Sequence, residues 1–149
     1  MIETAVLISI KPKWVKLILS GQKTIEVRKT VPKLTPPLTC YIYESGTGCV
    51  VGEFVYDSYT YFLNTYGRYV GRKDTPEKSC LSEKELLDYV GENEVGFEWR
   101  ISSVVEYDEP LPLSAFCDMG GNQIKKPPQS WRYVRRNENE HHLHGENDF

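Results

Sequence analysis

Three charged residues in one short run carry the clearest chemical signal in the sequence: Lys23, Glu26 and Arg28. Residues 23–29 alternate as a β-strand does, which places Thr24, Glu26 and Arg28 on one face. Arg28 suits a phosphate or a base edge because its guanidinium donates in a fixed fork, whereas Glu26 suits an amino or hydroxyl group. Lys23 adds a cation that can reach the same space. If these groups lie in a pocket, they predict a mixed-charge binding site. If they lie on an open strand, the exposed ion pair contributes little to stability.

The chain of 149 residues has a formal net charge of −3, which is unevenly spread. Residues 1–33 hold seven basic and two acidic side chains, a balance of +5, and residues 34–149 have a balance of −8. The total argues against a dedicated binder of duplex DNA, while the asymmetry predicts a local positive field that faces an anion. The alternative is that these lysines solvate a helix face and strand edges.

Two further pairs of residues are candidates for contact with a nucleic acid. Lys11 and Lys13 belong to the positive N-terminal part, and Trp131 and Arg132 form a basic-aromatic pair near the other end. Exposed rings stack on unpaired bases, so these four residues join the predicted RNA- or ligand-binding set. For Trp131 the alternative is core packing, and the sequence favours neither; for most of the tyrosines in residues 56–66 we favour core packing.

Neither a metal site nor a cofactor is predicted. The four cysteines, at positions 40, 49, 80 and 117, form no C-x-x-C pair, so we interpret them as structural thiols. The three histidines, at positions 141, 142 and 144, are candidate metal chelators, but in an acidic chain end we favour no role for them. No G-x-G-x-x-G, P-loop or H-E-x-x-H pattern occurs.

The elements next to the charged run have clear local signals. Residues 4–10 alternate and are rich in Val and Ile, which predicts a strand with one buried face. Pro12 fits the first position of a helix whose apolar stripe begins at Trp14, and Gly21 is placed to end it in a left-handed turn. The charged run should therefore follow a helix and a tight turn.

The rest of the chain is predicted to form further strands and one more capped helix. Residues 38–44 and 49–56 are predicted strands joined by a hairpin, and residues 95–107 form a long one. Ser82 and Glu85 have the spacing of a capping box, which predicts a helix that ends at Gly91. Residues 59–73 fit either a helix or an irregular crossover, residues 118–129 a loop, and residues 130–134 a last short strand.

These elements predict an α+β fold that is mainly β: a small β-barrel with two or three short flanking helices. We expect one domain over residues 1–136 and a disordered acidic tail over residues 137–149. No apolar run is long enough to cross a bilayer, and the N-terminus lacks the pattern of a signal peptide, so the expected location is cytoplasmic.

The run from Ile8 to Arg28 resembles the opening of ASCH domains. Their signature, a helix followed by G-x-K-x-x-E-x-R, is met by Gly21, Lys23, Glu26 and Arg28. Softer similarities extend the resemblance over residues 5–134, and the stretch from Pro127 to Trp131 is similar to an ending seen in phage and prophage members. The resemblance implies a PUA-like β-barrel with a basic cleft for RNA that includes Lys23, Glu26 and Arg28.

The resemblance leaves three functions open. One is a module that binds RNA or a nucleotide. A second is a hydrolase: small relatives cleave acylated cytidine with a lysine and a threonine of this strand and a distant glutamate, and a ribonuclease activity is also associated with the family. Lys23 matches the lysine and would be the activating base; Glu26 holds the threonine's place and, lacking a hydroxyl nucleophile, would carry a proton or anchor substrate. The third is a phage or regulatory interaction protein with a vestigial pocket.

Overall fold

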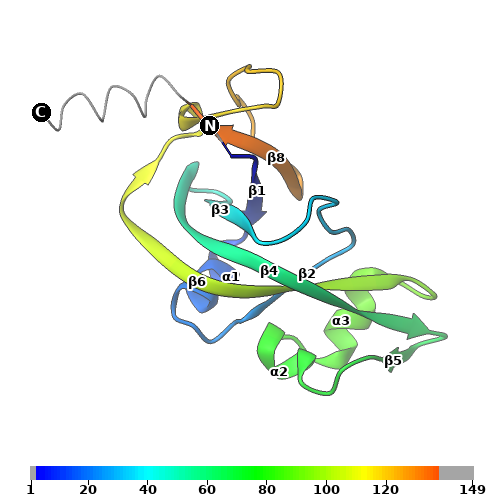
Figure 1. The fold of residues 1–149 in the computed structure, drawn as a ribbon. Coiled ribbons are helices and arrows are strands. Elements are labelled where there is room, and N and C mark those ends of the chain that lie inside the picture. Colours follow the sequence, from blue (N-terminus) through cyan, green and yellow to red (C-terminus); the bar gives the residue numbers. More distant parts are fainter. Residues whose placement is uncertain (1–2, 138–149) are drawn as a thin grey trace, which may run out of the picture.

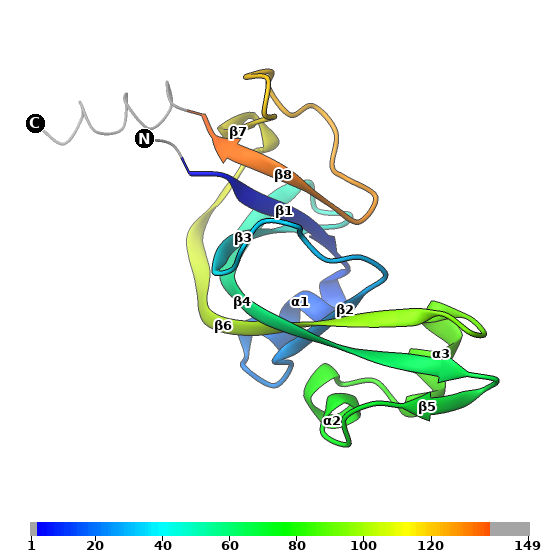
Figure 2. The ribbon, with the colours of Figure 1, turned by 45° about the vertical axis from the view of Figure 1, so that its right-hand side comes forward.

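The computed structural model describes residues 3–137, and one curved sheet organises them. Its eight strands pair in the order β2-β6-β4-β3-β1-β8-β7, and β5 pairs with β4. The strands are β1 (Ala5–Ile10), β2 (Ile25–Arg28), β3 (Leu38–Glu44), β4 (Cys49–Thr65), β5 (Arg68–Val70), β6 (Val95–Leu111), β7 (Phe116–Cys117) and β8 (Trp131–Arg136). All pairs are antiparallel except β1 with β3. The long strands β4 and β6 run side by side through the molecule (Figures 1 and 2).

Three short helices and a 3-10 turn accompany the sheet. They are α1 (Pro12–Leu19), α2 (Thr75–Ser79), α3 (Glu83–Val90) and the turn Leu113–Ala115. α1 begins with Pro12 and is followed by Gly21 at φ +84°, as predicted. α3 has the predicted capping box, in which Ser82 and Glu85 bond each other's backbone N–H, and it ends at Gly91. Figure 2 shows α2, α3 and β5 gathered at one end, away from β7 and β8.

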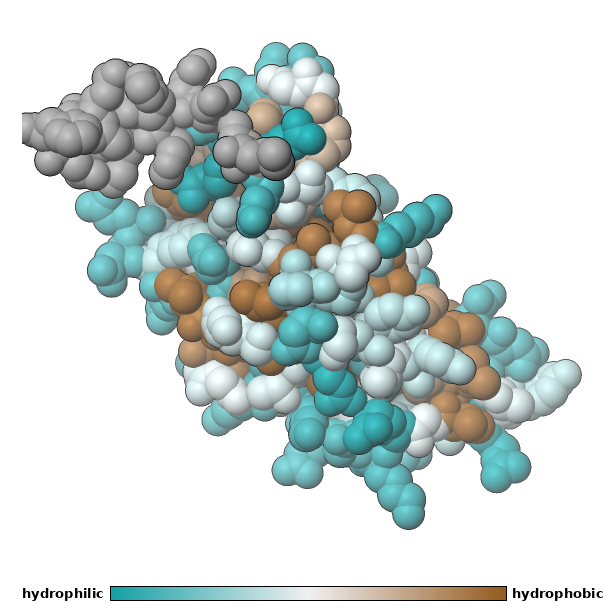
Figure 3. Space-filling model, viewed as in Figure 1, coloured by the Kyte–Doolittle hydropathy of each residue, from teal (hydrophilic) through white to brown (hydrophobic). Residues whose placement is uncertain are grey.

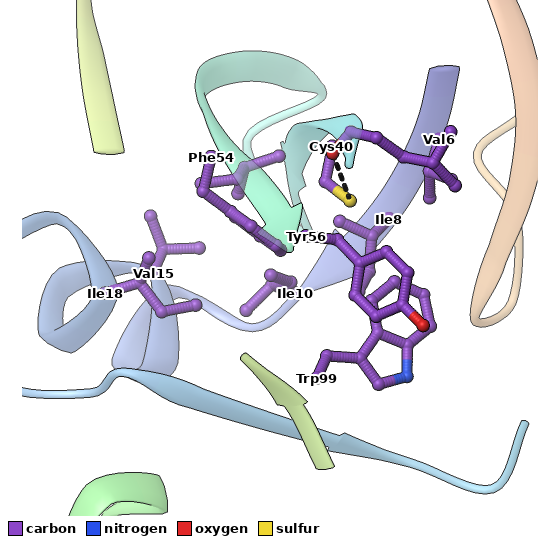
Figure 4. Close-up of a cluster of buried hydrophobic side chains, with 11 residues drawn as sticks. Val6, Ile8, Ile10, Val15, Ile18, Cys40, Phe54, Tyr56 and Trp99 are labelled. Carbon is purple, nitrogen blue, oxygen red and sulfur yellow. Dashed lines mark hydrogen bonds between the residues drawn. The ribbon is translucent and has the colours of Figure 1, made fainter. Parts of the chain in front are cut away.

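The largest core lies between α1 and the inner faces of β1, β3, β4 and β6. Figure 4 shows Val15 and Ile18 of α1 on one side of it and the rings of Tyr56 and Trp99 on the other. A second cluster fills the region near β7 and β8, and a third joins β2 to α3 through Ile25 and Leu86. On the face drawn in Figure 3, the exposed apolar residues form several separate patches.

The mainly β prediction is confirmed, but a closed barrel is not. β2 and β7 lie at the two ends of the path of paired strands, so the sheet stays open. Residues 59–73, for which a helix or a crossover was predicted, instead complete β4 and continue into β5. β-Bulges in the β4–β6 pairing, one between Tyr56 and Ser58, break the two-residue alternation that would have marked β4 as one strand.

Two sequence predictions fall wholly or partly outside the described residues. The predicted tail over residues 137–149, with its three histidines, lies beyond residue 137, apart from Asn137 itself.

The four cysteines are all described, and all are free thiols. No helix within residues 3–137 is long and apolar enough to span a membrane.

Candidate functional site

A cleft of about 630 Å³ opens beside β2 and brings together residues from distant parts of the chain. It is lined by the end of β1, by α1, β2 and α3, and by the segment that precedes β8. The lining residues are Ser9, Lys11, Trp14, Lys23, Glu26, Val27, Arg28, Ser45, Leu81, Glu85, Asp88, Tyr89, Gln129 and Ser130. We call this feature the cleft.

Local backbone geometry places the charged run in the cleft. After the turn at Gly21, the N–H of Lys23 donates to the carbonyl of Leu17 at 3.0 Å, which holds the lysine under α1. β2 then pairs with β6 in a register that sets Glu26 opposite Trp99. Glu26 and Arg28 are two residues apart on one strand, so both face the cleft, as the alternation predicted.

Glu26 lies between two cations. Its Oε1 is 3.5 Å from Nζ of Lys23, and its Oε2 is 2.7 Å from Nη2 of Arg28 and accepts from Nε of Arg28 at 2.8 Å. The three side chains are almost entirely buried, with exposed fractions of 2%, 8% and 11% for Lys23, Glu26 and Arg28. Within residues 3–137, Glu26 is the one carboxylate that forms an ion pair with either cation.

The protein itself occupies the donors of Arg28. Besides Glu26, Nη2 donates to the carbonyl of Ser9 at 2.8 Å, and Nη1 donates to Oγ of Ser130 at 3.1 Å. All three guanidinium nitrogens therefore have protein acceptors. Arg28 joins β2 to β1 and to the start of β8, and it has little donor capacity left for a phosphate.

Lys23 is equally enclosed. Its Nζ donates to the backbone carbonyl of Ser79 at the end of α2 and lies 5.0 Å from the ring centre of Trp14. Burial lowers the pKa of Lys23 below its usual value, and the charge of Glu26 partly offsets that lowering. The sequence suggested a mobile cation here; the structure has a fixed one, because α2 closes over it.

The cleft is charge-balanced and not basic. Three of its lining residues are cations (Lys11, Lys23 and Arg28) and three are carboxylates (Glu26, Glu85 and Asp88). The resemblance had implied a basic cleft, and this part of the expectation is corrected. α3 brings both extra carboxylates to the rim. Such a lining suits a polar, weakly charged group better than a bare phosphate.

Aromatic rings flank the buried charges. Trp14 of α1 and Tyr89 of α3 both line the cleft. Burial raises the pKa of Tyr89, so its hydroxyl keeps its proton. The oxygen Oε1 of Glu26, which also lines the cleft, has Lys23 at 3.5 Å as its only close partner among the described residues. The cleft therefore offers stacking surfaces and an accepting carboxylate.

Of the other predicted site residues, Lys11 lines the cleft, and Lys13, Thr24, Trp131 and Arg132 do not. Lys11 lines it, whereas Lys13 is exposed on α1 with Nζ 4.6 Å over the Trp14 ring. Thr24 is exposed ahead of β2 and is not part of the lining. Arg132 is exposed, and Trp131 is partly buried, with its ring 5.6 Å from that of Trp99 and its Nε1 donating to Oγ1 of Thr30.

Sequence reasoning missed the partners of the charged run. Ser9 and Ser130 bond Arg28, Ser79 bonds Lys23, and Tyr89 adds a ring. These residues lie up to 102 positions away in the chain. Ser9 lies in β1, Ser79 ends α2 and Ser130 precedes β8, and single serines in such places carry no distinctive sequence pattern, so no local signal could have singled them out.

The sequence matches the ASCH domain family over residues 8–110. The crystal structure of an ASCH protein from Zymomonas mobilis is similar, with a TM-score of 0.70 and 21% identity over 94% of each chain. Crystal structures of two single-substitution variants of the Zymomonas mobilis protein both give a TM-score of 0.69, again at 21% identity; they cover 94% of this chain and 96% and 94% of theirs. At this identity the likeness concerns the fold. No curated protein sequence matches the chain.

Proposed function

The chain belongs to the ASCH domain family, and from this premise we propose that its cleft binds RNA or a nucleotide at the site that Lys23, Glu26 and Arg28 form together. ASCH domains have a PUA-like fold and generally bind RNA. The observation that carries the proposal is the convergence of these three side chains at 2.7 to 3.5 Å in a cleft flanked by two aromatic rings. A cytoplasmic location and a likeness to phage and prophage members stay predictions.

The geometry gives these residues different roles. Because Arg28 and Lys23 are held by protein acceptors, they fix and polarise Glu26 and do not clamp a phosphate. Glu26 accepts from an amino or hydroxyl group of the ligand, and Trp14 and Tyr89 hold an unpaired base. Lys11, exposed at the rim, is the cation available to a neighbouring phosphate.

A titration of labelled single-stranded RNA, followed by anisotropy at several salt concentrations, tests this proposal. Tyr89→Ala should weaken binding by about 5- to 150-fold, since a base stacked on an aromatic ring contributes about 1 to 3 kcal/mol. Lys11→Ala should reduce the slope of log K against log salt by about 0.7, the share of one phosphate contact.

The exposed loop residue Lys125 provides the matched control. Lys125→Ala should leave both the affinity and the salt slope unchanged. Absence of RNA binding by the wild-type protein at low salt would overturn the proposal, as would equal losses in Lys125→Ala and Lys11→Ala.

The lowered pKa of Lys23 favours a second candidate function, a hydrolase that acts on an acylated nucleoside or on RNA. A buried lysine that loses its proton more readily can serve as the activating base, with Glu26, at 3.5 Å, as the proton carrier. In this chain the carboxylate cannot act as a hydroxyl nucleophile, so water would have to attack the acyl carbon.

Release of cytidine from acylated cytidines, followed by chromatography, tests the hydrolase. If Lys23 is the base, the rate should rise with pH through its lowered pKa and then level off, because only the neutral amine accepts a proton. Lys23→Met should abolish turnover. Equal rates for the variant and the wild-type protein would exclude Lys23 as the base and point to a contaminant. The same pair of proteins, incubated with RNA, tests the ribonuclease.

A further inference from the structure

A second hollow, of about 470 Å³, lies outside the cleft, between the loop that follows β2 and the face of β4 and β6. We call it the groove. Its lining residues are Thr30, Val31, Pro32, Lys33, Leu34, Thr35, Pro36, Tyr56, Tyr59 and Phe97. The proposed function does not use it, and it shares no residue with the cleft.

The sheet side of the groove is aromatic. In the β4–β6 register Tyr56 lies opposite Ile101 and Tyr59 opposite Trp99, so the bulge after Tyr56 keeps both tyrosines on one face. The rings of Tyr59 and Phe97 meet edge to face, with centres 5.9 Å apart. Tyr59 is 47% exposed, so about half of the residue is accessible to a ligand.

The floor of the groove contains an unpaired polar group. Tyr56 is fully buried, and its hydroxyl has no hydrogen-bond partner among the described residues. A buried hydroxyl without a partner costs about 1 to 3 kcal/mol, which a ligand acceptor would recover. Burial raises the pKa of Tyr56 to about 12, so the hydroxyl remains a donor at neutral pH.

Thr30 links the groove to the cleft. It lines the groove, its carbonyl accepts from Nε1 of Trp99 at 3.0 Å, and its Oγ1 accepts from Nε1 of Trp131 at 2.8 Å. Trp131 follows Ser130, which bonds Arg28 in the cleft. The cleft and the groove are thus connected through the contacts of Thr30, Trp131 and Ser130.

We propose that the groove is a second subsite for single-stranded RNA, in which an unpaired base stacks on Tyr59 and accepts a hydrogen bond from the Tyr56 hydroxyl. The inference rests on the proposed function, because it extends the same strand from the cleft. Lys33, in the groove wall, faces the adjoining phosphate. The Tyr56 hydroxyl is itself buried, so a base that reaches it must displace part of the groove wall.

The test compares three tyrosine variants in binding a labelled decamer of uridine. Tyr59→Ala should weaken binding by about 5- to 150-fold, as expected for the loss of one stacked base. Tyr56→Phe, which removes only the hydroxyl, should weaken it by about 2- to 10-fold. Tyr61, also on β4 and 58% exposed, does not line the groove, so Tyr61→Ala is the matched control and should bind as the wild-type protein does.

The outcomes separate this inference from the proposed function. If the wild-type protein binds RNA and Tyr59→Ala stays within twofold of Tyr61→Ala, the groove is no subsite although the cleft proposal stands. If the wild-type protein binds no RNA, both fail. Photo-crosslinks from thiouridine-substituted RNA to the peptide that contains Tyr59 would support the subsite. An effect of Tyr59→Ala on self-association alone, measured by sedimentation, would assign the groove to a second copy of the chain and overturn it.

Discussion

Replacement of Glu26 by alanine is expected to lower the free energy of unfolding by about 3 to 5 kcal/mol, the loss typical of breaking a buried ion pair. Glu26 holds Lys23 and Arg28 at 3.5 and 2.7 Å, and no other carboxylate within residues 3–137 pairs with either cation. Without Glu26, the two buried cations lie close together with no carboxylate to neutralise them. Urea unfolding followed by circular dichroism measures the loss.

The pH dependence of this loss identifies its cause. Burial lowers the pKa of Lys23, and removal of Glu26 takes away the charge that offsets the lowering. Between that lowered pKa and the usual value near 10.4, the unfolded chain binds more protons than the folded chain, so stability rises with pH in this window. Glu26→Ala should therefore regain stability as the pH rises from the lowered pKa of Lys23 toward its usual value, and by more than the wild-type protein gains.

Two further variants make the Glu26 experiment decisive. Glu106, an exposed carboxylate of β6, is the matched control, and Glu106→Ala should change stability by less than about 0.5 kcal/mol. Adding Lys23→Met to Glu26→Ala should restore about 0.5 to 3 kcal/mol of the free energy of unfolding, because one of the two buried charges without a counter-ion is removed. If the double variant is no more stable than Glu26→Ala, the loss arises from packing and the electrostatic account is wrong.

The parts of this fold that depend on near neighbours could be predicted from the sequence. The ends of α1 and α3 were predicted correctly, because Pro12, Gly21 and the capping box act within one helical turn. The common face of Glu26 and Arg28 was predicted as well, since alternation is a property of one strand. These features need no knowledge of what packs against them.

The state of the charged residues could not be predicted, because it depends on distant segments. Burial of Lys23 requires α2, which begins more than fifty residues later. Glu98, a charged residue between Phe97 and Trp99 in β6, is fully buried, with its carboxylate accepting from Thr60 and Thr75. Sequence alone shows which residues share a face, and packing decides whether that face meets water.

The burial of Trp99 also depends on distant segments, and its replacement is the second change for which we predict a large loss of stability. Trp99 is fully buried, its ring lies 5.2 Å from that of Tyr56 (Figure 4), and its Nε1 donates to the carbonyl of Thr30 at 3.0 Å. It is also the β6 neighbour of Glu26. Trp99→Ala should lower the free energy of unfolding by about 3 to 5 kcal/mol, because a large cavity opens between the sheet and the loop at Thr30.

Trp99→Phe separates the hydrogen bond from the packing. It keeps an aromatic ring in the core but leaves the Thr30 carbonyl without its donor, which should cost about 1 to 3 kcal/mol. Since Thr30 lines the groove and not the cleft, this variant should weaken the binding of long RNA while leaving a single nucleotide bound as in the wild-type protein. An equal loss for both ligands would show that Trp99 supports the cleft through Glu26, and the separation of the two subsites would then fail.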